Sequence, residues 1–174
     1  SFLVPDEVST HFRQAADAGR KLQESWQAAI EAYRENFKAP AAEWDRWMND
    51  RLPGDWENDI PVFETDEKGL ATRVASGTVL NAVAPTISNL IGGSADLAPS
   101  TKTLLSGEAD YQATNYAGRN LRFGVREHAM GGILNGMALH RGLIPYGATF
   151  LVFSDYMRPA IRLAALTKLK VIYV

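Results

Sequence analysis

Residues 121–140 read LRFGVREHAMGGILNGMALH, and this stretch indicates the fold because it joins a strand to a helix. Residues 121–125 have the apolar character of a short buried strand. The segment from Glu127 to His140 is rich in apolar and small residues, which predicts a helix packed on all sides, with glycines that let neighbouring backbone approach. Glu127 therefore begins a helix and faces a buried setting, although most glutamates at such a position only complement the helix dipole.

The rest of residues 61–174 continues this alternation of strands and helices. The patterns predict helices at 70–84, 127–140 and 154–167. They predict strands at 87–92, 121–125, 143–149 and 169–174. Such a succession is typical of an α/β fold in which a parallel sheet carries helices on both faces.

Residues 1–60 have a different composition and predict a helical arm. All four tryptophans precede Asp59, whereas nearly all the glycines follow it. Apolar residues recur at steps of three and four between Val8 and Phe37, which predicts an amphipathic helix, and a shorter helix is expected from Ala41 to Leu52. No ionisable cluster in the arm calls for chemistry, so we expect its tryptophans to pack against the rest of the chain or a partner surface.

Charge and composition exclude several classes of function. The 18 basic and 20 acidic residues are intermixed and give a net charge of -2, which argues against a nucleic-acid partner. The absence of cysteine excludes disulfides and cysteine-ligated metals. No apolar run is long enough to span a bilayer, and the first residues lack the pattern of a signal peptide. We therefore expect a cytoplasmic protein with no membrane partner, and a plastid location is left open.

Polar residues follow the carboxyl ends of three predicted strands, where parallel sheets bind ligands. The first strand is followed by a predicted tight glycine turn that contains Asp96 and Ser100, and the second by Glu127. The third is followed by aromatic residues at 150, 153 and 156. Taken singly, such a turn or aromatic spacing is more often structural, but together they would place an acid, backbone amides and an aromatic wall at one sheet edge.

Four strings that occur in order carry a resemblance to a known family. They are LATRVASGTVLN (70–81), IGGSADLAPS (91–100), FGVREHAMGGILNGMALH (123–140) and PYGATFLVFSDYMRPAIRLAAL (145–166). These strings resemble the pyrimidine-binding domain of transketolase, a thiamine-diphosphate enzyme of sugar-phosphate interconversion. The tryptophan-rich arm is similar to the family's connection between its first and second domains. The resemblance therefore implies a linker arm at 1–60, a pyrimidine-binding domain at 61–174 truncated at its C-terminal end, and absent diphosphate-binding and C-terminal domains.

The resemblance implies a catalytic role for Glu127, as the glutamate that hydrogen-bonds N1′ of the cofactor's aminopyrimidine ring. Because burial disfavours the charge of a carboxylate, we expect a raised pKa and a proton that Glu127 can share with the ring. His128 has no metal-binding partners at suitable spacing, and Trp56 stands where the family's metal motif has a second glycine after Gly54-Asp55. We therefore expect no metal ligands in this chain.

The resemblance implies binding roles for six further residues. Phe150, Phe153 and Tyr156 are expected to pack around the aminopyrimidine, with Phe153 stacked on it. Asp96 is expected near the thiazolium ring, where a negative charge favours a cation. Arg73 and Ser100 are expected to hold the phosphate of the sugar, because a guanidinium fork suits phosphate geometry.

The implied activity is transfer of a two-carbon ketol unit from a ketose phosphate to an aldose phosphate, in the pentose phosphate pathway or the Calvin cycle. The family's thiamine diphosphate lies between two subunits of a homodimer, with Mg²⁺ or Ca²⁺ held by the diphosphate-binding domain, so we expect half a site here and an inactive isolated chain. Two alternatives stay open. One is a related thiamine-diphosphate enzyme such as dihydroxyacetone synthase, and the other is a non-catalytic assembly or regulatory module.

Overall fold

The computed structural model describes residues 2–65 and 67–174, which form two compact units. The first unit extends to Asp45 and the second runs from Arg46 to Val174. The division falls within helix α2 (Lys38–Met48). The domain boundary expected after residue 60 stays a prediction.

The first unit is dominated by helix α1 (Asp6–Asn36), which confirms the predicted amphipathic helix. Pro5 precedes it, and Asp6 and Glu7 occupy the first turn, where negative charge complements the helix dipole. No residue of α1 is buried, and its apolar stripe includes Trp26 at 52% exposure. Packing of this stripe against another surface stays a prediction.

Helix α2 begins earlier than the sequence pattern predicts, because Pro40 lies inside its first turn rather than before it. Proline is tolerated there since the first N–H groups of a helix have no intrahelical partner. Arg34 and Asp45 link α1 to α2 through two hydrogen bonds of 3.2 and 2.8 Å. The helix ends at Met48 instead of Leu52, and the chain then turns at Asp50, which has a φ of 53°.

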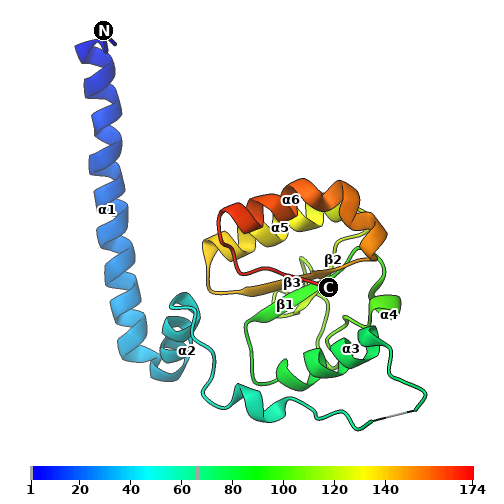
Figure 1. Cartoon of the computed structure of the whole chain (residues 1–174). Helices are drawn as coiled ribbons and strands as arrows, with labels where there is room; N and C mark the ends of the chain where they lie inside the picture. The colour runs from blue at the N-terminus through cyan, green and yellow to red at the C-terminus, as the bar shows by residue number, and fades with distance from the viewer. Residues whose placement is uncertain (1, 66) are drawn as a thin grey trace. The chain divides into compact units, whose positions relative to one another are not determined.

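The second unit is built on a sheet of four parallel strands in the order β2-β1-β3-β4 (Figure 1). The strands are β1 (Leu90–Ser94), β2 (Asn120–Arg122), β3 (Ile144–Ala148) and β4 (Ile172–Tyr173). Helices α5 (Glu127–His140) and α6 (Ser154–Leu166) cover one face, and α3 (Thr72–Val83) covers the other. This arrangement confirms the predicted α/β class with helices on both faces of a parallel sheet.

Three short elements were not predicted from the sequence. They are η1 (Trp56–Asp59), α4 (Ala98–Thr101) and η2 (Leu151–Phe153). Each is only three or four residues long, which is too short for a hydrophobic period to be visible in the sequence.

Strand β1 starts three residues later than predicted because Arg119 holds the preceding segment as a turn. Its Nη1 lies 3.0–3.3 Å from four carbonyl oxygens, and its Nη2 is 2.7 Å from the Glu108 carboxylate. The four carbonyls belong to Ala84, Ile87, Ser88 and Leu90. Pairing with β3 begins at Leu90, which lies opposite Ile144.

Gly92 and Gly93 lie inside β1, so the predicted glycine turn after the strand is wrong. A Cβ on Gly93 would lie 1.8 Å from the carbonyl oxygen of Leu121, and one on Gly92 would lie 2.1 Å from that of Tyr146. These glycines therefore let neighbouring strands approach closely. The turn is formed further on, at Asp96, which has a φ of 63°.

Helix α5 has the predicted bounds, but the expectation that it is packed on all sides is wrong. Ile133 and Leu139 are 49% and 67% exposed. A Cβ on Gly131 would lie 2.8 Å from the Cβ of Ala160, so this glycine lets α5 approach α6. Gly132 and Gly136 have no neighbouring atom within 4 Å of an added Cβ.

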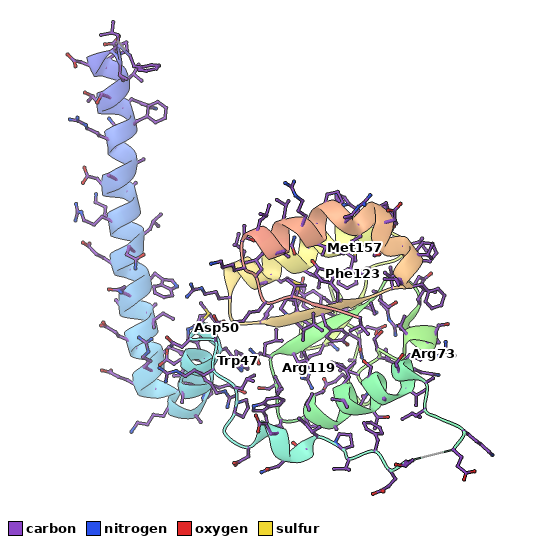
Figure 2. The ribbon with its side chains drawn as sticks, in the orientation of Figure 1. Trp47, Asp50, Arg73, Arg119, Phe123 and Met157 are labelled. Carbon is purple, nitrogen blue, oxygen red and sulfur yellow. The ribbon has the colours of Figure 1, made fainter. Side chains whose placement is uncertain are left out.

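Two apolar clusters fill the spaces on either side of the sheet. The cluster on the α3 side consists of Val83, Ala84, Ile87, Leu90, Leu105 and Tyr146. The cluster beneath α5 and α6 consists of Ala95, Phe123, Met130, Leu134, Met157 and Ala160. Figure 2 shows Phe123 and Met157 between the sheet and these helices. No helix within residues 2–65 and 67–174 combines the length and apolarity needed to cross a membrane.

Candidate functional site

Glu127 is a buried carboxylate at the first position of α5, directly beyond β2, and its exposed fraction is 1%. Thr149 Oγ1 donates a hydrogen bond of 2.8 Å to Oε1, and the Tyr156 hydroxyl donates one to Oε2. Both carboxylate oxygens are therefore held by side chains from other elements. Among the described residues Glu127 forms no ion pair, so neutral hydroxyls anchor this acid.

Tyr156 also supplies a hydrogen-bond partner to the start of α5. Its phenol oxygen accepts a hydrogen bond of 2.8 Å from the backbone N–H of Glu127. The residue before the helix, Arg126, provides no side-chain cap. Because the first N–H groups of a helix have no intrahelical acceptor, a phenol from α6 satisfies one of them.

Thr149 is a member of this site that the sequence analysis missed. It directly follows β3, and its backbone N–H donates a hydrogen bond of 3.1 Å to the carbonyl oxygen of Val174. A hydroxyl just beyond the carboxyl end of a parallel strand is a signal that could have found it.

The expected rise in the pKa of Glu127 is wrong in its net direction. Burial raises the pKa, as predicted, but the hydrogen bonds from Tyr156, Thr149 and the backbone amide together hold it below its ordinary value. Hydrogen bonds donated to a carboxylate favour the charged form. Glu127 is therefore ionised at neutral pH in this chain. The same contact with Glu127 raises the pKa of Tyr156.

The three aromatic residues lie where the chain leaves β3. The rings of Phe150 and Phe153 are stacked, with centroids 6.4 Å apart and an interplanar angle of 13°. Phe150 and Phe153 are 42% and 40% exposed, and Tyr156 is 48% exposed. The structure thus brings Tyr156 into direct contact with Glu127, and presents two further aromatic rings on the segment that begins at Thr149.

Asp96 lies at the same edge of the sheet as Glu127, beyond the carboxyl end of β1. The preceding residue, Ala95, donates a backbone hydrogen bond of 3.1 Å to the carbonyl oxygen of Ala148 at the end of β3. Ser94 Oγ accepts a hydrogen bond of 2.9 Å from the N–H of Leu97, which closes the turn around Asp96. The Asp96 side chain is exposed at this turn.

Arg73, labelled in Figure 2, and Ser100 are exposed and lie on two helices that contact each other. Arg73 is in the first turn of α3 and Ser100 is in α4. A Cβ on Gly77 of α3 would lie 2.6 Å from the carbonyl oxygen of Lys102, the residue that follows α4, so the two helices approach closely. Among the described residues no hydrogen bond joins Arg73 to Ser100 or either of them to Glu127.

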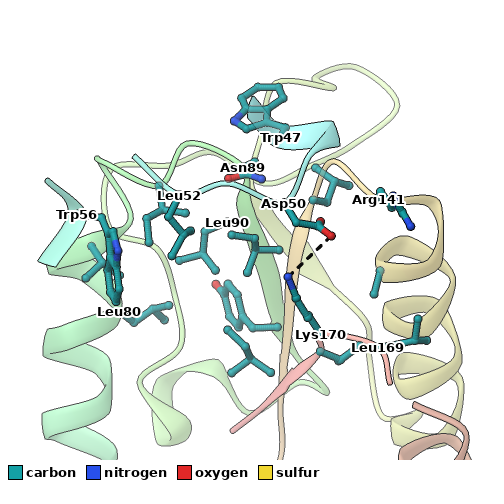
Figure 3. Close-up of a pocket in the computed structure, with 18 of the residues that line it drawn as sticks. Trp47, Asp50, Leu52, Trp56, Leu80, Asn89, Leu90, Arg141, Leu169 and Lys170 are labelled. Carbon is teal, nitrogen blue, oxygen red and sulfur yellow. Dashed lines mark ion pairs between the residues drawn. The ribbon is translucent and has the colours of Figure 1, made fainter. Parts of the chain in front are cut away.

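A cavity of about 910 Å³ in the second unit lies at the opposite edge of the sheet (Figure 3). It reaches Leu90 and Ile144, the first residues of β1 and β3, whereas Glu127 lies beyond the carboxyl ends of the strands. Its walls are mainly apolar, and an ion pair of 3.8 Å joins Asp50 to Lys170. No buried acid or base faces it among the described residues, so we place the candidate site at Glu127.

No group of three or more histidine, aspartate or glutamate residues in the described part of the chain could hold a metal ion. The chemistry available at the candidate site is that of an ionised carboxylate, two hydroxyls and aromatic rings. Such a set can accept a hydrogen bond from a planar heterocycle and stack against its face.

Residues 68–174 match the family model of the transketolase pyrimidine binding domain. The chain belongs to the transketolase family. Residues 1–53 match the model of the transketolase thiamine diphosphate binding domain. The linker role expected for residues 1–60 stays a prediction.

Known transketolases are similar to this chain along nearly its whole length. The enzyme of Geobacillus stearothermophilus is 52% identical over 99% of the chain, and the chain covers 26% of that protein. Transketolase-1 of Arabidopsis thaliana, a chloroplastic protein, is 47% identical over 99% of the chain, which covers 24% of it. The chain thus spans about a quarter of the length of these relatives.

Solved transketolases have the same fold. A structure from Pichia stipitis in complex with sedoheptulose 7-phosphate superposes with a TM-score of 0.91 at 37% identity, over 99% of this chain and 26% of that one. The transketolase of Leishmania mexicana gives a TM-score of 0.90 at 40% identity, over 98% and 25% of the two chains.

Proposed function

We propose that this chain is part of a transketolase that transfers a two-carbon ketol unit from a ketose phosphate to an aldose phosphate with thiamine diphosphate. The observation that carries the proposal is the buried carboxylate of Glu127, held by Thr149 and Tyr156 at the carboxyl edge of a parallel sheet, in a chain of the transketolase family. Ligands of such sheets bind at this edge.

The residues present fit the aminopyrimidine half of thiamine diphosphate. Glu127 offers a carboxylate to the ring nitrogen N1′, and the exposed rings of Phe150, Phe153 and Tyr156 offer apolar surface to the ring faces. Because its pKa is lowered, Glu127 is ionised and accepts a hydrogen bond from an N–H of the ring. It therefore stabilises a proton on N1′ and does not donate that proton itself. When bound, the cofactor supplies a nucleophilic carbon and an electron sink for cleavage of the ketose.

Asp96, Arg73 and Ser100 complete the proposed site. Asp96 places negative charge at the same edge as Glu127, where it would favour the cationic thiazolium ring. Arg73 and Ser100, exposed on contacting helices, would bind the phosphate of the sugar through a guanidinium fork and a hydroxyl. That role accords with a family member from Pichia stipitis whose structure contains a sugar phosphate.

We also propose that the working enzyme is a homodimer and that the rest of its protein holds Mg²⁺ or Ca²⁺ with the cofactor's diphosphate. Apolar side chains exposed beyond β2 and β3 support an interface at this edge, since Val125, Leu151 and Val152 are 77%, 88% and 71% exposed. The isolated chain is then inactive, because half of the site is supplied by another polypeptide region. We propose a cytoplasmic location, or a plastid one as in the chloroplastic relative.

The test is two-carbon transfer by a full-length protein that contains this chain. We expect transfer from xylulose 5-phosphate to ribose 5-phosphate, and a loss of kcat of about 100-fold or more in Glu127→Gln, in line with the contribution of a positioned proton-transfer group. The exposed Glu64→Gln serves as the control and should keep full activity.

The other outcomes discriminate the alternatives. A folded full-length protein without transfer to any aldose would point to an assembly or regulatory module. Transfer to another acceptor but not to ribose 5-phosphate would point to a related enzyme such as dihydroxyacetone synthase. An active Glu127→Gln variant would remove Glu127 from the mechanism.

A further inference from the structure

The two hydroxyls that hold Glu127 come from different layers of the fold. Thr149 leaves the carboxyl end of β3, and its N–H is bonded to Val174 beyond β4, so its backbone is fixed to the sheet. Tyr156 comes from helix α6. Oε1 of the carboxylate is thus anchored to the sheet, and Oε2 to a helix.

The side chain of Thr149 is suited to hold one fixed direction. Threonine is branched at Cβ, which restricts its χ1 angle and therefore the direction of its hydroxyl. Tyr156 is 48% exposed, and its hydroxyl makes both of its contacts with Glu127. Oε2 is therefore held by a side chain that reaches solvent.

We propose that Thr149 is a positioning residue, whose hydroxyl fixes Oε1 of Glu127 to the sheet and so presents Oε2, on the side of Tyr156, to the ring nitrogen of the cofactor. The inference rests on the proposed function, because it assigns the oxygens of a carboxylate whose catalytic role is itself proposed. Thr149 does not touch the reacting atoms and acts only through Glu127.

Among the residues that the structure describes, no charged side chain competes with these hydroxyls in setting the charge state of Glu127. Its chain neighbours, Arg126 before α5 and His128 within it, are exposed, and on α6 Asp155 and Arg158 pair with each other at 3.3 Å. Residues 144–149 carry no charge, and the phenol of Tyr146 is buried and bonded to the carbonyl oxygen of Thr103. Loss of one hydroxyl should therefore change the pKa of the Glu127 carboxylate directly.

The first experiment titrates Glu127 by NMR of its ¹³Cδ in the 174-residue chain, without cofactor. Thr149→Val, which keeps the branched shape and removes the hydroxyl, should raise the pKa of Glu127, because an ionised carboxylate loses a donor. Thr149→Ser keeps the hydroxyl and should titrate like the parent chain. If Thr149→Val does not fold, Thr149→Ala takes its place. A folded hydroxyl-free variant with an unchanged titration would overturn the proposal.

The second experiment measures kcat and KM in the full-length protein. Thr149→Val should lower kcat by about tenfold or more while the KM values for sugars stay unchanged, because a hydrogen bond to a charged group is lost. Thr149→Ser should restore kcat. An unchanged kcat in Thr149→Val would overturn the positioning role. If Glu127→Gln kept full transfer activity, the proposed function would fail and the role of Oε2 with it, whatever the cofactor-free titration shows about Thr149.

Discussion

Tyr156 and Glu127 are joined at two points: the phenol oxygen accepts a hydrogen bond from the backbone N–H of Glu127 and donates one to its carboxylate. A single side chain of α6 therefore both caps α5 and orients its first residue. Since α5 and α6 also approach through Gly131 and Ala160, the helix pair and the candidate site form one structural unit. Changes at this contact should alter both stability and chemistry.

Replacement of Tyr156 by phenylalanine should destabilise the fold by about 1–3 kcal/mol. The helix N–H loses its acceptor and the buried carboxylate loses a donor, and such unsatisfied groups cost this much. The measurement is the free energy of unfolding by urea, with Tyr116→Phe, at a tyrosine 71% exposed, as the control. Equal stability of the two variants would contradict the role of the Tyr156 hydroxyl.

The stability of the chain should fall in acid partly through Glu127. Its folded pKa lies below the ordinary value despite burial, because three hydrogen bonds favour the charged form. The stabilisation is therefore complete above the unfolded pKa of about 4.3 and is lost as pH falls through the lower folded pKa. Unfolding free energies measured from pH 7 to pH 3 should fall less steeply in Glu127→Gln than in the parent. Glu64→Gln should keep the parent slope, and parallel curves for all three would refute the assignment.

The sequence predicted the order and class of the long elements because their hydrophobic periods extend over several turns. Helix α5 has the expected bounds, and α1, α3 and α6 lie within a few residues of theirs. Strand β1 begins later than predicted because its start is set by Arg119. This residue lies far along the chain, and no local sequence pattern shows its contacts. The glycines of β1 were misread because Gly-Gly favours turns, whereas here close strand packing requires them.

The site could be predicted only in part. The buried position of Glu127 follows from a carboxylate that begins an apolar helix after a strand. The direction of its pKa shift does not follow, because it depends on hydroxyls 22 and 29 residues away that only the fold brings into contact. Burial alone predicts a raised pKa, and the hydrogen bonds reverse it.

Two glycines should respond in opposite ways to alanine. In Gly93→Ala the new Cβ would lie 1.8 Å from a backbone oxygen of β2, so β1 and β2 must separate, and we expect a loss of about 3 kcal/mol or more. Gly136→Ala, in open space on α5, should stabilise the chain by up to about 1 kcal/mol. Thermal unfolding of both variants checks this, and a neutral Gly93→Ala would contradict the strand packing.

Arg73 should affect substrates according to their phosphate group. In a full-length protein Arg73→Ala should raise KM for phosphorylated donors by about tenfold or more, as loss of a charge-assisted contact implies, and leave unphosphorylated donors nearly unchanged. Since Arg73 is exposed, the fold should be unaffected. Arg162→Ala, at an exposed arginine of α6, is the control. Equal effects on both donor types would remove Arg73 from the phosphate site.

Arg119→Lys should destabilise the second unit although it keeps the charge. The guanidinium lies near four carbonyl oxygens and pairs with Glu108 at 2.7 Å, and its side chain is only 15% exposed. A lysine ammonium is a single point donor and cannot span both groups, so about 2 kcal/mol or more should be lost.

Arg122 provides the matched comparison for Arg119 because it lies three residues further along and makes one ion pair with Asp110 at 55% exposure. Exposed pairs contribute about 0–1 kcal/mol, so Arg122→Lys should change little. Urea unfolding of the two variants measures the difference. If Arg119→Lys proved as mild as Arg122→Lys, the turn before β1 would owe its shape to the local chain, and the late start of that strand would need another cause.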